Sequence, residues 1–99
     1  MKTKQIITAA TAAANSDKQR ISSNNPMTFN GFGFSGSDVV DIQFSHDDGT
    51  TWVDCYREGS KIQLSATNNQ VTVYGPGVFR ASKGTTTGTV GVSSTTEQG

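Results

Sequence analysis

The 99-residue chain has little cysteine, proline or aromatic residue and no long apolar run. Its single cysteine, Cys55, excludes an intramolecular disulfide and any metal site built from several cysteines. No apolar run approaches the roughly 20 residues that a membrane-spanning helix needs, so we expect no contact with a membrane. After Lys2 and Lys4 the N-terminus has only Ile6-Ile7, which is too short for a secretory signal. We therefore expect a soluble protein that acts where it is made or assembled.

Neither sign of charge dominates the sequence. Eight Lys and Arg residues balance eight Asp and Glu residues, and both are scattered along the chain. Because no stripe of basic residues could neutralise phosphate groups, we do not expect nucleic-acid binding. A net charge of zero also removes self-repulsion, which suits a protein that packs densely against copies of itself or against neighbours.

The residues that are abundant are typical of a β-rich domain. Hydrophobic residues make up 32% of the chain and there are 11 glycines, with threonine, serine and asparagine common among the rest. A chain of this length supports one domain with one core. The composition predicts many turns and a modest core.

Short apolar–polar alternations recur between turn signals, and no convincing helix interrupts them. They predict about six to eight short strands at roughly 8–12-residue spacing, which favours an all-β antiparallel sandwich of Ig-like or jelly-roll-like form. A small closed barrel would use the same alternation and is the alternative. The positions expected to face inward are Met27, Phe29, Val40, Ile42, Phe44, Ile62, Leu64, Val71, Val73, Val90 and Val92.

The first quarter of the chain has a weaker pattern than the rest. Residues 4–8 could form an edge strand, and residues 8–14 are rich enough in alanine for a helical turn. This stretch has too few large apolar side chains to hold itself onto a core. We therefore predict an N-terminal arm over residues 1–25, a sandwich body over 26–94 and a polar C-terminal tail over 95–99.

The octet Ser45-His46-Asp47-Asp48-Gly49-Thr50-Thr51-Trp52 lies between two apolar runs. Asp-Gly in such a place is a strong hairpin signal, because the turn needs residues that accept a positive φ. The Asp47 carboxylate can accept hydrogen bonds from nearby backbone N–H groups and so close the loop. Written S-x-D-x-G-x-T-W, the octet resembles the Asp-box of sialidases and other β-proteins, which implies a structural hairpin remote from catalysis. Its signature residues are Ser45, Asp47, Gly49, Thr51 and Trp52.

Acidic residues gather around this octet: Asp41, Asp47, Asp48 and Asp54 lie near the single histidine, His46. A calcium site or an acid–base pair would use such residues. We favour a structural role, because alternation places Asp41 and the hairpin tip about 20 Å apart along one strand. The sequence also has no D-x-D-x-D-G loop, G-x-S-x-G elbow or phosphate-cradling glycine loop. We therefore expect no enzyme activity, catalytic residue, metal or cofactor.

Other side chains leave alternatives open. Trp52, Tyr56 and Tyr74 would form a sugar-stacking platform if exposed, although most aromatic side chains are expected in the core or an interface. Arg80 follows a Gly-Pro-Gly turn in an otherwise apolar strand, where it makes either an outward salt bridge or a contact between subunits. We expect Cys55 to be a small, partly buried strand residue rather than a reactive thiol.

From about residue 26 to 93 the order of these signals resembles that of small β-sandwich proteins among the virion structural proteins of tailed bacteriophages. The likeness is carried by Ser45–Trp52, Ile62–Leu64, Gly75–Arg80 and Gly88–Val92. Such proteins decorate capsids or belong to tails and fibres, often as multimers. The sequence departs from their commonest form in residues 46–50 and in its longer N-terminal arm.

The resemblance implies a non-enzymatic virion structural protein that decorates and stabilises a capsid, with a tail or fibre-attachment component as the alternative. A carbohydrate or host-surface binding module is a further alternative. The implied partners are major capsid or tail proteins and further copies of the chain, in a virion assembled in the host cytoplasm. The side chains expected to contact other subunits are Ile6 and Ile7 of the arm, together with Arg80.

Overall fold

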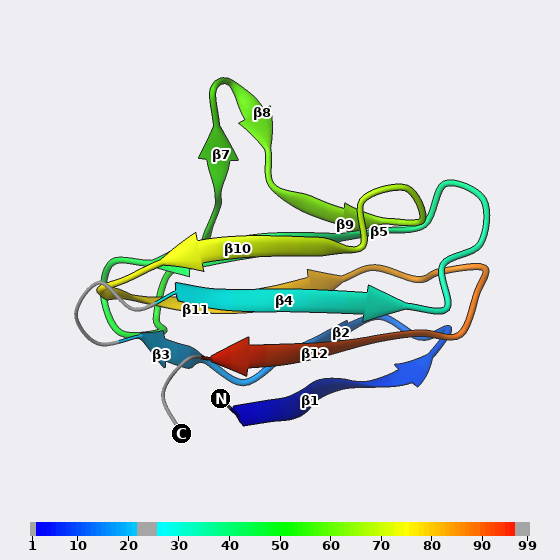
Figure 1. The fold of residues 1–99 in the computed structure, drawn as a ribbon, viewed down its shortest axis with the longest axis horizontal. Helices are drawn as coiled ribbons and strands as arrows, with labels where there is room; N and C mark the ends of the chain where they lie inside the picture. The colour runs from blue at the N-terminus through cyan, green and yellow to red at the C-terminus, as the bar shows by residue number, and fades with distance from the viewer. Residues whose placement is uncertain (1, 22–25, 97–99) are drawn as a thin grey trace.

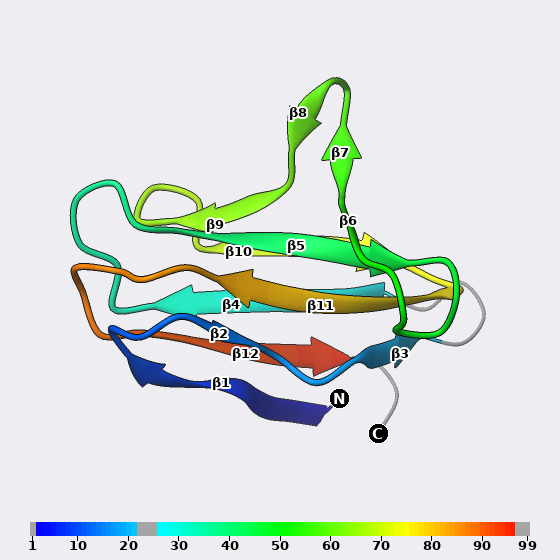
Figure 2. The same cartoon turned by 180° about the vertical axis from the view of Figure 1, so that it is seen from behind.

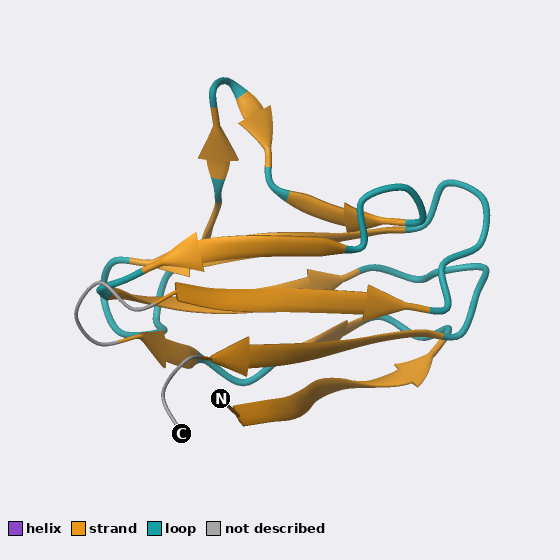
Figure 3. Cartoon of the chain, in the orientation of Figure 1, coloured by secondary structure: helices purple, strands orange, loops and turns teal. Residues whose placement is uncertain are grey.

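The structure, a computed structural model, describes residues 2–21 and 26–96, which form strands and connecting loops (Figure 3). In chain order the strands are β1 (Lys2–Ala10), β2 (Ala14–Asn15), β3 (Gln19–Ile21), β4 (Pro26–Phe32), β5 (Val39–Ser45), β6 (Val53–Asp54), β7 (Tyr56–Arg57), β8 (Ser60–Lys61), β9 (Gln63–Ser65), β10 (Gln70–Tyr74), β11 (Gly77–Lys83) and β12 (Val90–Thr96). Within these described ranges no helix is long and apolar enough to cross a membrane.

The strands form two antiparallel layers that pack face to face (Figures 1 and 2). One layer is a four-stranded sheet in the order β1-β12-β4-β10. The other is a six-stranded sheet in the order β2-β11-β5-β6, in which β3 also pairs with β11 and β9 with β5. The β7–β8 hairpin projects away from both layers (Figure 1). The predicted all-β antiparallel sandwich is confirmed.

Alternate side chains of the two sheets meet between the layers and form the core. All of the residues predicted to face inward lie there, either buried or packed partly buried against it. Burying one large apolar side chain contributes about 1.5–3 kcal/mol, so these alternating positions supply most of the stabilisation. The largest fully buried side chains are Phe29, Val40, Ile42, Leu64, Val90 and Val92.

Residues 2–21 are part of the sandwich and do not form an arm, which corrects the predicted division into an arm and a body. β1 pairs with β12 at one edge of the four-stranded sheet, and β3 pairs with β11 in the other sheet. Ile7 and Ile21 are only 3% and 4% exposed and belong to the core. A small domain buries little apolar surface, so it needs these side chains. Residues 22–25 of the predicted arm lie outside the described residues.

The edge strand predicted over residues 4–8 is confirmed as part of β1, but irregular pairing explains why its place in the sandwich was not evident from the sequence. Its register with β12 shifts between Gln5 and Ile7 and again between Ile7 and Ala10. Such bulges change which face a side chain occupies, so β1 shows no clean period-2 pattern. At the other end of the chain β12 continues to Thr96, so the predicted tail over residues 95–99 begins too early. Residues 97–99 lie outside the described part.

The chain that follows the octet leaves the six-stranded sheet to form the projecting hairpin. β6 and β9 both pair with β5, and the chain between them leaves the sheet as β7 and β8. Backbone hydrogen bonds close its base: Cys55 N–H donates to Ile42 O (3.0 Å), Ile42 N–H to Ile62 O (3.1 Å) and Ile62 N–H to Cys55 O (2.8 Å). At its tip Glu58 and Gly59 have φ of 53° and 82°, the positive values that a type I′ turn requires.

Two charged side chains fasten the loops at one end of the sandwich. The Asp38 carboxylate accepts backbone hydrogen bonds from Thr87 (2.9 Å) and Gly88 (2.8 Å), and these two bonds lower its pKa. Lys83 is buried, and its ammonium group donates to the Val90 carbonyl at 3.1 Å and to the end of β1. A buried ammonium group without such partners would be costly, so these bonds stabilise the closed end.

Candidate functional site

The octet Ser45–Trp52 forms the loop between β5 and β6, and the structure places its five signature residues together. Ser45 Oγ donates to Asp47 Oδ1 (2.8 Å) and accepts from the Gly49 N–H (2.7 Å). Asp47 Oδ1 also accepts from the Thr51 N–H at 2.7 Å, and Trp52 Nε1–H donates to the Gly49 carbonyl at 3.1 Å. The loop therefore satisfies its own polar groups, as a structural hairpin would.

The Asp47 carboxylate is committed to this loop. The Thr51 backbone N–H, followed by the Ser45 hydroxyl, holds the pKa of Asp47 far below its ordinary value. His46 Nε2 lies 3.9 Å from the other Asp47 oxygen, and its side chain is 67% exposed. A carboxylate whose charged form is stabilised in this way is a poor general acid. Within residues 2–21 and 26–96, no three His, Cys, Asp or Glu side chains gather as a metal site would require.

Asp48 ties the loop to the N-terminal part of the chain. It has φ 62°, next to Gly49 at φ 104°, so the Asp-Gly pair occupies the left-handed region that its turn requires. Its carboxylate pairs with Arg20 and lies 3.4 Å from Lys18 Nζ. The hydrogen bond from Arg20, then that from Lys18, lowers the pKa of Asp48. These groups are exposed, so the ion pairs orient the loop more than they stabilise the fold.

Arg80 links the octet to the outer face of the six-stranded sheet. Its guanidinium carbon lies 4.5 Å from the centre of the Trp52 ring, and its Nε–H donates to Gln43 Oε1 at 2.8 Å. Gln43 Nε2–H in turn donates to Asp54 Oδ1 at 3.0 Å, and this bond is the main cause of the lowered pKa of Asp54. Within residues 2–21 and 26–96 these contacts stand in place of the outward salt bridge expected of Arg80, and its contact with another subunit stays a prediction.

The same row of polar contacts continues across the sheet. Lys61 Nζ lies 3.4 Å from the Asp54 carboxylate and 4.0 Å from that of Asp41. These two charges, with Asp41 the larger contributor, raise the pKa of Lys61. Gln63 Nε2–H donates to Asp41 Oδ1 at 2.6 Å. Each acidic residue around the octet therefore pairs with a cationic side chain or an amide N–H group, and their carboxylates do not gather at one position.

The remaining residues predicted to contact other subunits lie against the core. Ile7 is buried in it, and Ile6 is half-buried and packs against it. Ile7 therefore has little surface left for a neighbouring subunit, and the contact of Ile6 with other subunits stays a prediction.

The exposed aromatic side chains lie on different elements. Tyr56 is 62% exposed on β7, and Tyr74 is 64% exposed at the end of β10. Trp52 has Arg80 over its ring, which occupies a face that a sugar would use. Burial raises the pKa of the Cys55 thiol to about 11, so at neutral pH it is protonated and unreactive.

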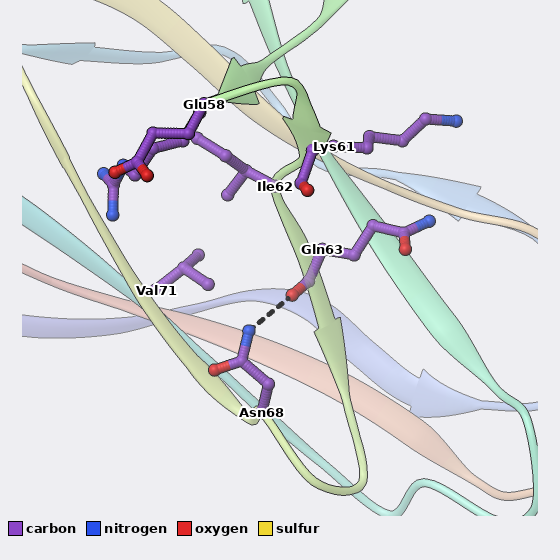
Figure 4. A pocket seen from close by; sticks show the side chains of 8 residues that line it. Glu58, Lys61, Ile62, Gln63, Asn68 and Val71 are labelled. Carbon is purple, nitrogen blue, oxygen red and sulfur yellow. Dashed lines mark hydrogen bonds between the residues drawn. The ribbon is translucent and has the colours of Figure 1, made fainter.

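The projecting hairpin creates a depression that the sequence did not suggest. It has a volume of about 390 Å³ and lies between the hairpin, β9 and β10 (Figure 4). Ile62 and Val71 form its apolar part, and Arg57 at its rim donates to the Thr72 carbonyl of β10 at 2.9 Å. In the sequence, the polar run of residues 56–61 could have indicated the hairpin, because it interrupts the alternation of apolar and polar residues.

Comparison with known proteins gives a likeness in structure but none in sequence. No protein-family model matches the chain, and no curated protein matches it in sequence. The crystal structure of SPBc2 prophage-derived protein YomS superposes with a TM-score of 0.74 and 15% sequence identity, covering 96% of this chain and 90% of that one. At this identity the likeness shows that the two chains share a fold over almost their whole lengths.

Proposed function

We propose that the chain is a non-enzymatic structural protein of a bacteriophage particle, most simply one that decorates and stabilises the capsid. The observation that carries the proposal is the shared fold with a prophage-derived protein over 96% of the chain. A tail or fibre-attachment component is the alternative location. In either place its partners are other virion proteins, and it acts in the virion after assembly in the host cytoplasm.

The arrangement of polar groups supports a structural role. Asp47, Asp48 and Asp54 hold loops and strands together through hydrogen bonds and ion pairs within the chain. The Cys55 thiol is protonated at neutral pH because its pKa is raised to about 11. An enzyme needs a nucleophile or a base in reach of a substrate, and these groups are used to stabilise the fold instead.

A carbohydrate or host-surface binding module is the second candidate. The exposed rings of Tyr56 and Tyr74 favour it, because aromatic rings with a polar tip are common where proteins bind ligands. A glycan-array screen of the purified chain tests this candidate. Binding that is lost in both Tyr56→Ala and Tyr74→Ala would support it.

Immunogold electron microscopy of purified particles tests the virion role. Antibodies raised against the purified chain should label particles of the phage that encodes it, and particles from a gene-deleted phage serve as the control. Label spread over the head supports capsid decoration, and label confined to the tail supports the alternative. A chain that is abundant in the lysate but absent from purified particles would contradict both.

A further inference from the structure

We propose that two copies of the chain pair through β10, which lies at one of the two edges of the four-stranded sheet. The pairing does not depend on the virion role proposed above. Among the described residues β10 pairs with β4 alone, so its other side offers main-chain hydrogen-bonding groups to another strand. The Gly31 N–H donates to the Asn69 carbonyl at 2.8 Å. Because alternate residues of an antiparallel ladder bond to the partner strand, the main-chain groups of Gln70, Thr72 and Tyr74 point away from β4.

The two edges of this sheet differ in their protection against strand pairing. β1 has an exposed Lys4 and a register that shifts twice, and natural edge strands use both devices to prevent pairing. β10 keeps an unbroken register with β4 from Gln70 to Tyr74 and contains no charged residue or proline. Its edge is therefore suited to accept an added strand.

One side chain, that of Arg57, reaches across this edge. Arg57 lies on the projecting hairpin, which rises beside β10 in Figure 1. Its Nη2–H donates to the outward carbonyl of Thr72 at 2.9 Å. A carbonyl oxygen has two lone pairs and can accept a second hydrogen bond. Arg57 is an exposed, flexible side chain, so it covers this acceptor far less firmly than a strand would.

The strand that fits this edge best is β10 of a second copy. Antiparallel pairing about a two-fold axis at Thr72 sets Thr72 opposite its counterpart and Gln70 opposite Tyr74 of the second copy. All of the outward main-chain groups then have partners, whereas an axis at a neighbouring residue would leave some unpaired. Neither β10 strand carries a charged residue, so no like charges meet between the two strands themselves, and the exposed ring of Tyr74 is covered by an uncharged side chain. Such a contact is isologous and closes as a dimer.

The depression beside the edge adds apolar area to this contact. Ile62 and Val71 are only partly buried in the single chain and line the depression next to β10 (Figure 4). A second strand laid along β10 would exclude water from both side chains. This burial gives the dimer a hydrophobic contribution in addition to its main-chain hydrogen bonds.

Sedimentation velocity of the full-length chain, between about 1 µM and 1 mM, tests the pairing. We expect a dimer that dissociates on dilution. Thr72→Lys and Thr72→Glu each place like charges face to face at the axis, so each should raise the dimer dissociation constant about fivefold or more. An equimolar mixture of the two variants should regain a dimer, because opposite charges then meet.

Thr3→Lys is the matched control, since it makes the same change on β1 at the opposite edge; it should leave the dimer unchanged. Circular dichroism of each variant checks that the monomer still folds. A wild-type chain that stays monomeric overturns the proposal and leaves the edge for a strand of a different protein. Dimers that persist in both Thr72 variants, or a mixture that stays monomeric, overturn it as well.

Discussion

At the scale of single residues, the loop between β5 and β6 depends on Asp47. Its carboxylate accepts the Thr51 N–H and the Ser45 hydroxyl, and both bonds favour the charged form. The folded state therefore binds a proton less readily than the unfolded state does. Stability from this group is complete above the unfolded-state pKa near 3.8 and is lost as the pH falls toward the lower folded-state pKa.

Asp47→Asn should lower the melting temperature at pH 7, because a neutral amide accepts these hydrogen bonds less strongly than a carboxylate does. The difference between variant and wild type should shrink as the pH is lowered from 4 toward 2, since the unfolded wild type then takes up a proton at Asp47 that it must release to fold. Thermal melts followed by circular dichroism measure both effects. A difference that stays constant down to pH 2 would contradict this account of the loop.

Arg80 is the second residue on which several contacts depend, because it joins Trp52 to Gln43. Arg80→Met should keep much of the packing but remove the charge, at a cost of about 1 kcal/mol in the free energy of unfolding. Since Trp52 is the only tryptophan, its fluorescence reports the loss of the overlying guanidinium directly.

Arg57→Met is the matched control for this change, because the guanidinium of Arg57 bonds to β10 and not to the indole. It should leave the tryptophan emission unchanged. Identical spectra for Arg80→Met and the wild type would mean that the two side chains do not stack in solution.

At the scale of elements, the β7–β8 hairpin is the least supported part of the fold. An isolated two-stranded hairpin is marginal in water, so it depends on the hydrogen bonds at its base and on the turn at its tip. Those base hydrogen bonds connect Cys55, Ile42 and Ile62, and they anchor the hairpin to β5. Lys61 also joins it to the acidic residues on the outer face of the six-stranded sheet.

Substitutions in the turn should change the stability of the hairpin in opposite directions. Glu58→Asn places a residue that tolerates φ 53° before the glycine and should stabilise the hairpin by about 0.5 kcal/mol. Gly59→Ala strains a residue at φ 82° and should destabilise it by about 1 kcal/mol. Amide hydrogen exchange of residues 56–61 measures both changes. Equal protection in the two variants would show that the turn does not limit hairpin stability.

At the scale of the whole molecule, β1 closes the sandwich. It pairs along β12 and contributes Ile7 to the core. A chain lacking residues 1–10 should therefore fail to fold, which a poorly dispersed ¹H–¹⁵N spectrum would reveal. Ile7→Ala should cost about 2–5 kcal/mol. The matched change Lys4→Ala, at an exposed position of the same strand, should cost less than about 0.5 kcal/mol. A native-like spectrum for the truncated chain would show that the fold does not require β1.

The sequence by itself determined the class of fold and many of the residues that face the core. Met27, Phe29, Val40 and Ile42 lie inside because a strand exposes alternate residues to opposite faces, and this property is local. The Asp-Gly turn at Asp48 could also be predicted, since its backbone conformation depends on the residues of the turn alone.

Tertiary structure alone decided how these pieces are combined. The pairing of β1 with β12 joins the two ends of the chain, and its bulges remove the alternation that would have marked it in the sequence. The exit of β7–β8 from the sheet depends on β6 and β9 sharing β5. The position of Arg80 over Trp52 likewise depends on β11 lying beside β5. Each of these contacts joins residues that are far apart in the sequence. The alternation and turn signals act only between near neighbours, so they do not specify which distant residues meet.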